Sequence, residues 1–511
     1  MIQCINTAML HGIDAISVKV ECDVSEGLPG FEMVGYLSGE VKEAGYRVKA
    51  ALKNVGYKLP AKKIMINFSP ANVKKSGTGF DLPVLLGVAA AYGLYNAKHL
   101  ENVMVVGEVS LTGKILPVHG ILPMVSHAKN IGITCCIVPM ENKLEAKMES
   151  GMKVVGVENV GELIQLLKSK KELWQEEDTE EIPLMEDEPI YAEDFSQIYG
   201  NELGKRAILV AVSGMHNLLF IGNPGAGKTM LASRIPTIMP DMDEKEMVEV
   251  TKIYSVCGLM KEKQTFIKKR PFRNPHHSAT SVSLVGGGFL AKPGEISLAH
   301  KGVLFLDELP EFQAKTLETL RQPMEEGKIS ITRLSGTYVY PSNFMLVGAM
   351  NPCPCGYYPD FTKCRCTEPA IQRYLGKVSG PLMDRMDLCV EVSEVKYEEL
   401  TRKKSGISSE EMKRKVEQAR ETQRRRFAEE DISYNSEMKV DHIEKYCKLS
   451  EDLQQWMEEI YKKKRMSVRG YHRVLKVART IADLEGHYNI EKTDLQEAFV
   501  YKNPDEKYWG R

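Results

Sequence analysis

The strongest constraint on this chain is an eight-residue segment that matches the pattern G-x-x-x-x-G-K-[ST] at every fixed position. Its residues are Gly222, Asn223, Pro224, Gly225, Ala226, Gly227, Lys228 and Thr229. The apolar run 218–221 before it predicts a strand, and 230–234 after it is compatible with a helix. In such a strand–loop–helix unit, backbone N–H groups turn inward around phosphates at a helix N-terminus. The segment therefore predicts a nucleotide site in which Lys228 contacts the β- and γ-phosphates and the Thr229 hydroxyl binds Mg²⁺.

Composition limits the class of protein. The chain has 511 residues, of which 43% are apolar and 27% charged, as in globular proteins with roughly three domains. A net charge of −1 means that any nucleic-acid contact must come from local basic patches. The odd number of cysteines, 11, and the absence of a basic leader in residues 1–5 favour a reducing cytoplasm over a disulfide framework. No uncharged apolar run approaches the ~18 residues of a membrane span.

An acidic segment divides the chain. Residues 171–189 are crowded with Glu and Asp and are predicted to be a solvated linker. Residues 1–170 mix strand and helix patterns: apolar residues alternate over 16–22, recur at helical spacing over 41–52, and form a strand at 65–68 and a buried helix at 80–92. We expect a nucleotide-binding domain over 190–395 and a mainly helical region over 396–511.

Two further apolar strands end in residues suited to nucleotide hydrolysis. The run 303–306 is followed by Asp307, expected to hold Mg²⁺, and by Glu308, expected to activate the attacking water. The run 344–349 leads to Asn351, whose amide could orient that water or touch the γ-phosphate. The alternative, an ordinary strand ending in two solvated acids, is weakened by the phosphate loop upstream.

Two arginines lie at positions that could clamp phosphate charge. Arg385 is in a turn ahead of an apolar strand, and Arg469 is in the first turn of a basic helix. A guanidinium delocalises charge and binds phosphate oxygens in a bidentate manner.

These motifs, in this order, resemble the magnesium-chelatase-like branch of the AAA+ ATPases, and within it the YifB/ComM type. The resemblance covers nearly the whole chain, and its most specific segments are 77–83, 273–277, 293–300 and 379–382. It implies an α/β P-loop core with a helical lid, preceded by an α+β domain like ribosomal protein S5 and the Lon protease domain. It also implies that Asn351 is the sensor-1 residue, Arg385 the arginine finger acting on a neighbouring subunit's ATP, and Arg469 the sensor-2 arginine of the lid.

The resemblance further implies a cytoplasmic homo-hexameric ring, with ATP and Mg²⁺ as cofactors. ATP hydrolysis would then drive a DNA helicase or translocase, with branch migration in recombination or competence as the specific activity. Two alternatives stay open, a motor subunit for metal insertion into a tetrapyrrole and a protein-remodelling ATPase. Chelatase motors of this kind lack an S5-like front domain and act beside a large porphyrin-binding subunit.

The first domain is not expected to be a peptidase. A Lon-type site needs a serine nucleophile and a lysine base. In a hand alignment, Gly79 falls at the serine position and Leu122 at the lysine position, so we expect a binding or assembly module. His119 lacks a paired nucleophile and is interpreted as structural.

Two predicted hairpins and two basic stretches are candidates for DNA contact without sequence specificity. The hairpins are an insert with its tip at 286–289 and residues 329–340, near Lys328 and Arg333. In related ring helicases such hairpins line the pore, and the alternative is a pair of surface hairpins with no ligand. The basic stretches are 413–426 and 462–479, and the alternative for each is a solvated helix face.

Four cysteines form a compact set of candidate ligands for a structural Zn²⁺: Cys353, Cys355, Cys364 and Cys366. The spacing C-x-C is tighter than the common C-x₂-C, and a metal-free loop is the alternative. The adjacent His276 and His277 project in different directions, so we expect them to pack or hydrogen-bond within the insert rather than share a metal.

Overall fold

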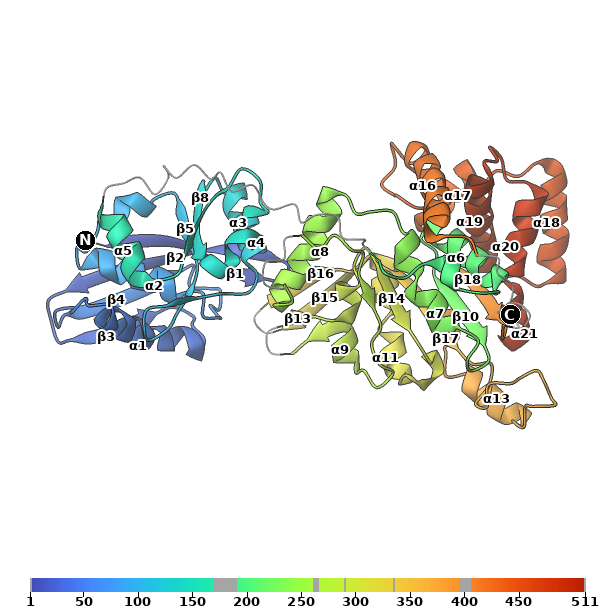
Figure 1. Ribbon diagram of the computed structural model, residues 1–511, viewed down its shortest axis with the longest axis horizontal. Helices are drawn as coiled ribbons and strands as arrows, with labels where there is room; N and C mark the ends of the chain where they lie inside the picture. The colour runs from blue at the N-terminus through green and yellow to red at the C-terminus, as the bar shows by residue number, and fades with distance from the viewer. Residues whose placement is uncertain are drawn as a thin grey trace.

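The computed structural model describes residues 2–169, 191–260, 266–288, 291–333, 336–395, 397 and 406–509. The predicted acidic linker 171–189, Phe289 at the tip of the insert, and the turn 334–335 lie outside the described residues. The first α/β unit and the C-terminal helices lie at opposite ends of the molecule, and the phosphate-loop sheet lies between them (Figure 1).

The first unit is a mixed sheet with helices packed on it. Its seven strands are ordered β3 (Gly30–Val34), β4 (Lys63–Ser69), β2 (Asp14–Ser25), β1 (Gln3–His11), β5 (Val103–Val105), β8 (Cys135–Pro139) and β9 (Lys153–Val157). Its helices are α1 (Gly39–Asn54), α2 (Asp81–Ala91), α3 (Ile121–Asn130), α4 (Lys143–Lys147) and α5 (Val160–Lys168), with a small hairpin β6 (Glu108–Val109) and β7 (Ile115–Leu116). The strands predicted at 16–22 and 65–68 and the helices predicted at 41–52 and 80–92 are confirmed.

The second unit contains a five-stranded parallel sheet. Its order is β11 (Phe272–Arg273), β14 (Val303–Leu306), β17 (Met345–Met350), β10 (Leu218–Gly222) and β18 (Leu388–Val392). Its helices are α6 (Glu202–Gly214), α7 (Lys228–Ser233), α8 (Glu244–Cys257), α9 (Ser281–Val285), α10 (Glu295–Leu298), α11 (Ala314–Glu318), α12 (Arg321–Glu326), α13 (Glu368–Leu375) and α14 (Gly380–Met383). Two hairpins project from it, β12 (Gly286–Gly287) with β13 (Lys292–Pro293), and β15 (Lys328–Arg333) with β16 (Gly336–Pro341).

This sheet is buried on both faces, which explains why its strands are continuous apolar runs. Along β10, Leu218 and Phe220 join the core beneath the C-terminal helices, whereas Leu219 and Ile221 join the core on the other face. All parallel strands end at one edge of the sheet, so the polar residues that follow β10, β14 and β17 meet there.

The C-terminal region is helical and shares the first of these cores. Its helices are α16 (Ser409–Arg426), α17 (Val440–Tyr446), α18 (Glu451–Lys463), α19 (Val468–Glu485), α20 (Lys492–Val500) and α21 (Asn503–Trp509). A buried polar contact ties this region to the sheet unit, because His216 and the Thr480 hydroxyl of α19 lie 2.8 Å apart.

The first unit docks on α8 and on the β15–β16 hairpin. The Gly120 N–H donates to the Ser255 carbonyl at 3.1 Å, and the Ser255 hydroxyl donates to the Glu145 carboxylate. At the hairpin, the rings of His11 and Tyr338 lie 4.7 Å apart between centroids. The hairpin predicted at 329–340 is therefore confirmed as a hairpin, and one of its faces is in contact with the first unit.

Candidate nucleotide site

The phosphate loop joins β10 to α7. Gly225 and Gly227 have φ values of 79° and 90°, a region that residues with a Cβ rarely adopt. These two glycines turn the backbone so that it enters α7 at Lys228. The strand and helix predicted around the motif are confirmed.

Lys228 is buried, and its ammonium donates to three oxygens. They are the carbonyls of Gly222 at 2.7 Å and Asn223 at 2.9 Å, and the side-chain oxygen of Asn351 at 3.1 Å. Burial lowers the pKa of Lys228, while the nearby acids Asp307 and Glu308 oppose that shift. The lysine therefore already lies beside the amide that follows β17.

The candidate magnesium ligands are in direct contact. The Thr229 hydroxyl donates to Asp307 Oδ2 at 2.7 Å, and the Glu308 backbone N–H donates to Asp307 Oδ1 at 2.9 Å. A hydroxyl paired with a carboxylate is an all-oxygen donor set, which fits the preference of Mg²⁺.

These side chains line one pocket of about 420 Å³. The pocket is lined by Pro224, Gly225, Ala226, Gly227, Lys228, Thr229, Met230, Asp307, Glu308, Met350 and Asn351. The sequence patterns did not predict Met230 or Met350 as site residues. Met230 directly follows Thr229, and Met350 directly precedes Asn351.

Glu308 has an unusual backbone and an additional partner. Its φ of 52° is in the left-handed region, where a non-glycine residue is uncommon. Its Oε2 lies 3.0 Å from Nδ1 of His277. His277, expected to pack or hydrogen-bond within the insert, therefore also lies beside an acid of the nucleotide pocket.

Arg385 and Arg469 do not line this pocket. Arg385 lies in the turn after α14, pairs with Glu325 and donates to the Pro381 carbonyl at 2.6 Å. Its Nε is buried and has no hydrogen-bond partner among the described residues. Arg385 therefore lies outside the pocket that contains Lys228 of the same chain.

Arg469 is exposed on α19 and lines a second pocket of about 450 Å³. Pro381 and Asp384, from the segment that carries Arg385, line the same pocket, together with basic side chains such as Arg465. The two predicted arginines thus belong to neighbouring surfaces.

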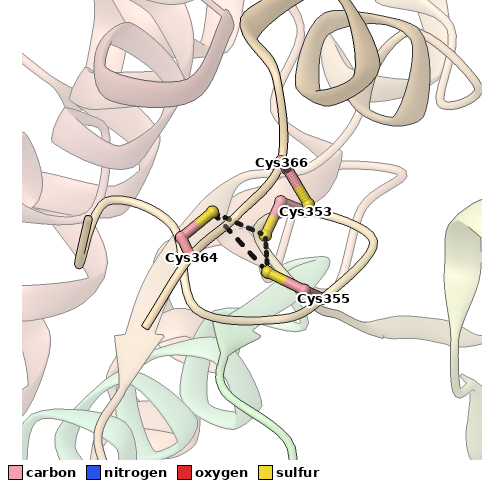
Figure 2. Close-up of side chains that lie close together, drawn as sticks. All are labelled: Cys353, Cys355, Cys364 and Cys366. Atoms are coloured by element: carbon pink, nitrogen blue, oxygen red, sulfur yellow. Dashed lines mark hydrogen bonds between the residues drawn. The ribbon is translucent and has the colours of Figure 1, made fainter. Parts of the chain in front are cut away.

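The four cysteine thiols converge between β17 and α13 (Figure 2). All four sulfur atoms lie within 4.8 Å of one another, with Cys353 to Cys355 at 3.4 Å and Cys355 to Cys364 at 3.6 Å. Burial raises the pKa of Cys355, but hydrogen bonds from the Tyr357 backbone and from Cys353 outweigh it and lower that pKa to about 6. Four clustered thiols are a donor set that fits tetrahedral Zn²⁺.

The basic side chains of the candidate DNA-contacting segments differ in their exposure and in their partners. Arg333 is exposed near the end of β15, and its Nε donates to the Gly288 carbonyl at 3.3 Å, so the two hairpins touch. On α16, Arg420 and Arg426 face inward, over the Tyr434 ring and onto Asp483 respectively. The basic stretch 462–479 spans the end of α18 at Lys463 and the start of α19 at Val468, so the prediction that a basic helix opens at Ser467, with Arg469 in its first turn, is confirmed.

The first unit carries a separate pocket of about 340 Å³ where it meets the second. Gly79 and His119 line it, together with Tyr338 of the hairpin. Leu122 is buried in α3, and its backbone N–H donates to Glu145 at 3.0 Å. Neither Gly79 nor Leu122 offers a nucleophile or a base.

Comparison with known proteins covers most of the chain. Residues 194–400 match the family described as magnesium chelatase, subunit ChlI; 20–142 match subunit ChlI of Mg-chelatase, and 406–502 match its C-terminal region. The competence protein ComM of Haemophilus influenzae is 40% identical over 96% of this chain and 95% of its own length. The uncharacterized protein YifB of Escherichia coli is 39% identical over 98% of this chain and 97% of its own.

A magnesium-chelatase 67 kDa subunit of Chlorobaculum parvum is 26% identical, over 31% of this chain and 23% of its own length. Among the described residues, no helix combines the length and the apolar character that a membrane crossing requires.

Proposed function

Because the chain belongs to the magnesium-chelatase-like AAA+ family of the ComM/YifB type, we propose that it is a ring-forming ATPase that couples ATP hydrolysis to DNA remodelling. The observation that carries the proposal is the single pocket lined by the phosphate loop, Asp307, Glu308 and Asn351. Branch migration of recombination intermediates is the specific activity, with DNA bound without sequence readout and with a cytoplasmic homo-hexamer as the assembly.

In the hydrolytic step, Glu308 accepts a proton from water while the water oxygen bonds to the γ-phosphorus and the bond to the β–γ bridging oxygen breaks. Lys228 and the N–H groups of the loop hold the β- and γ-phosphates, and Asn351 orients the γ-phosphate or the water. Thr229 and Asp307 would hold Mg²⁺, which neutralises phosphate charge when it is bound.

Arg385 and Arg469 are proposed to complete the pocket of a neighbouring chain. Both lie outside their own chain's pocket, and Pro381 and Asp384 connect the surfaces that carry them. The unpartnered Nε of Arg385 and its exposed partner Glu325 favour an exchange in which phosphate oxygens replace the glutamate. The helical region 406–509 would then be the lid, and the first unit an S5-like binding or assembly module.

The cysteine cluster is proposed to be a structural Zn²⁺ site. Cys353, Cys355, Cys364 and Cys366 would supply all four ligands and leave no open position for catalysis. Since Cys353 follows Asn351 by two residues, the cluster would brace the loop beside the nucleotide.

The relatives favour DNA over a tetrapyrrole as the substrate. The competence protein is similar over 96% of this chain, including the first unit, whereas the magnesium-chelatase subunit is similar over only 31%. A motor for metal insertion and a protein-remodelling ATPase remain the alternative functions.

The test is an ATPase and branch-migration assay on a synthetic four-way junction. We expect the junction to stimulate ATP hydrolysis and to be converted to duplex products only when ATP is present. Stimulation by an unfolded protein but not by DNA would replace the proposal with protein remodelling. Absence of ATP turnover under every condition of assembly would contradict both.

A further inference from the structure

We propose that the first unit binds an unpaired DNA strand along the exposed face of α1. The inference goes beyond the proposed function, which assigns no ligand to this unit, and rests on it only in taking DNA as the partner. Residues 35–75 contain nine Lys and Arg but only two Glu, although the net charge of the whole chain is −1. A local basic excess of this kind is the electrostatic footprint of a site for a polyanion.

Helix α1 separates its residues into two faces. Its buried residues are Val41, Ala44, Gly45, Val48, Ala51 and Leu52. A row of exposed side chains, called the basic row below, consists of Lys42, Tyr46, Lys49 and Lys53. The spacing of four, three and four residues places them one above the other on the face opposite the core. Because α1 has 16 residues, this face is about 24 Å long.

The lysines of the basic row are not neutralised by neighbouring acids. None of the three forms an ion pair with an acid in the part of the chain that the structure describes. The exposed Glu43, which follows Lys42, pairs instead with Arg47 at 3.7 Å. Lys49 and Lys53 are four residues apart, a spacing at which like charges on a helix repel each other. Phosphate groups bound between these lysines would remove that repulsion.

Helix α16 shows the contrasting pattern of a solvated basic helix. Its Arg414 pairs with Glu410 at 2.5 Å. Both Arg424 and Arg425 pair with Glu421, at 2.8 and 2.9 Å. The exposed charges of α16 are therefore balanced within the helix itself. The basic row of α1 has no such balance, so it is the stronger candidate for binding phosphates.

Exposed aromatic rings accompany the lysines. Tyr46 is 79% exposed in the middle of the basic row. The Nζ atom of Lys49 lies over the ring of Phe31 in β3, 4.8 Å from its centroid. Single-strand sites combine lysines that contact phosphates with aromatic rings on which bases stack. In a duplex the bases are already stacked on one another, so an exposed tyrosine in this setting favours an unpaired strand.

A second lysine–tyrosine pair lies at the start of α1. The Nζ atom of Lys74 is 5.9 Å from the ring centroid of Tyr36, which is half-exposed. The Lys75 N–H donates to the Tyr36 carbonyl at 2.8 Å, and the Ser38 N–H donates to the Lys75 carbonyl at 2.9 Å. Since Ser38 is the N-cap of α1, these backbone hydrogen bonds hold the pair beside the end of the helix that carries Lys42.

This pair connects the basic row to the two hairpins of the second unit. Lys74 lines the pocket of about 340 Å³ between the units. Lys292 of β13 and Tyr338 of β16 line the same pocket, so both hairpins meet Lys74 there. A strand that contacts the hairpins can therefore continue past Lys74 onto α1 without leaving a basic surface.

Two explanations compete with a DNA site. The first is that the basic row is only a solvated helix face, in which case its charge would influence DNA no more than charge elsewhere on the first unit. The second is that the row contacts an anionic membrane surface, which lysines also attract.

The experiment measures binding of the full chain to a fluorescein-labelled oligodeoxythymidylate, by fluorescence anisotropy over a range of salt concentrations. A triple variant removes the charge of the basic row with a residue that favours helices: Lys42→Gln, Lys49→Gln and Lys53→Gln. Tyr46→Ala removes the ring, and it is measured on the single strand and on the same strand annealed to its complement.

The matched control is a second triple variant on the same unit, in which each replaced lysine pairs with a glutamate: Lys62→Gln, Lys114→Gln and Lys129→Gln. It changes the net charge by the same amount as the first triple variant. Thermal unfolding of each variant verifies that it is folded, and single substitutions at positions 42 and 53 repeat the comparison if a triple variant is not.

We expect the basic-row variant to lower single-strand affinity by at least about tenfold. The slope of log K against log salt becomes shallower by about 2, at about 0.7 for each lost phosphate contact. Tyr46→Ala lowers single-strand affinity by about tenfold and leaves duplex affinity within about twofold. In every variant, kcat without DNA stays within about twofold of the wild type, because none of these residues lines the nucleotide pocket.

Single-strand affinity that is unchanged in the basic-row variant would overturn the inference, as would an equal loss in the control variant. An equal loss of duplex and single-strand affinity in Tyr46→Ala would overturn the assignment to an unpaired strand. If the basic-row variant lost binding to phosphatidylserine vesicles but kept its affinity for DNA, the row would belong to a membrane contact instead. Failure of the proposed function has a different signature, since the wild type would then bind the strand through the basic row without ATP-dependent conversion of the junction.

Discussion

The two acids after β14 have different environments at the scale of single residues. Asp307 is held by the Thr229 hydroxyl at 2.7 Å, as a metal ligand would be. Glu308 has a left-handed backbone and an exposed carboxylate whose Oε2 lies 3.0 Å from Nδ1 of His277. Strain of this kind persists where the surrounding structure fixes it, and it is concentrated at functional sites. These environments support the proposed roles of Asp307 as a metal ligand and of Glu308 as the base.

The first prediction concerns Glu308→Gln. The amide keeps the shape of the side chain but cannot accept a proton, so ATP binding is retained and kcat falls by about 10³. Equilibrium binding of a fluorescent ATP analogue and steady-state hydrolysis measure the two effects. Glu311→Gln is the control, since Glu311 lies nearby but pairs with Lys377 on the surface. Turnover that survives in Glu308→Gln would remove Glu308 from its role.

The residues of the site were predictable to different degrees. The phosphate loop and the acids after β14 follow from local spacing, because each group lies within a few residues of the strand that positions it. The pairing of His277 with Glu308 depends on β11 lying beside β14, which no local pattern specifies. The Lys228–Asn351 contact likewise joins residues that are distant in the sequence.

At the scale of elements, apolar runs identified the central strands because both faces of the sheet are buried. The start of a basic helix at Ser467 was also predictable from the sequence, and α19 confirms it. Ser467 caps α19, and its hydroxyl accepts a hydrogen bond from the Gly470 N–H at 3.0 Å. Such a cap starts a new helix, and the basic stretch 462–479 is therefore divided between α18 and α19.

The second prediction concerns the cysteine loop. We expect the purified chain to contain about one zinc per protomer, as four thiolates close one tetrahedral site. Cys364→Ser should lose the metal, and limited proteolysis within 353–366 should become about tenfold faster because the loop is no longer braced. Cys4→Ser, at an exposed cysteine outside the cluster, serves as the control. Elemental analysis that finds no zinc in the wild type would refute the assignment.

At the scale of the whole molecule, the residues proposed to form one composite site lie on two different surfaces of the chain. Lys228, Asp307 and Glu308 line the nucleotide pocket, whereas Arg469 and the segment of Arg385 line another. In the proposed closed assembly of identical chains, the arginine surface of one chain would lie against the pocket of the next.

The most direct test of this account mixes two inactive variants. Lys228→Ala cannot hold the nucleotide but keeps its arginine, and Arg385→Ala keeps its pocket but lacks the arginine. We expect each variant alone to hydrolyse ATP at background rate. In an equal mixture, an Arg385→Ala pocket that faces a Lys228→Ala neighbour is complete, so random assembly should recover about a quarter of the wild-type rate. A mixture that remains at background, although both variants assemble and Arg385→Ala binds ATP, would contradict a site shared between chains.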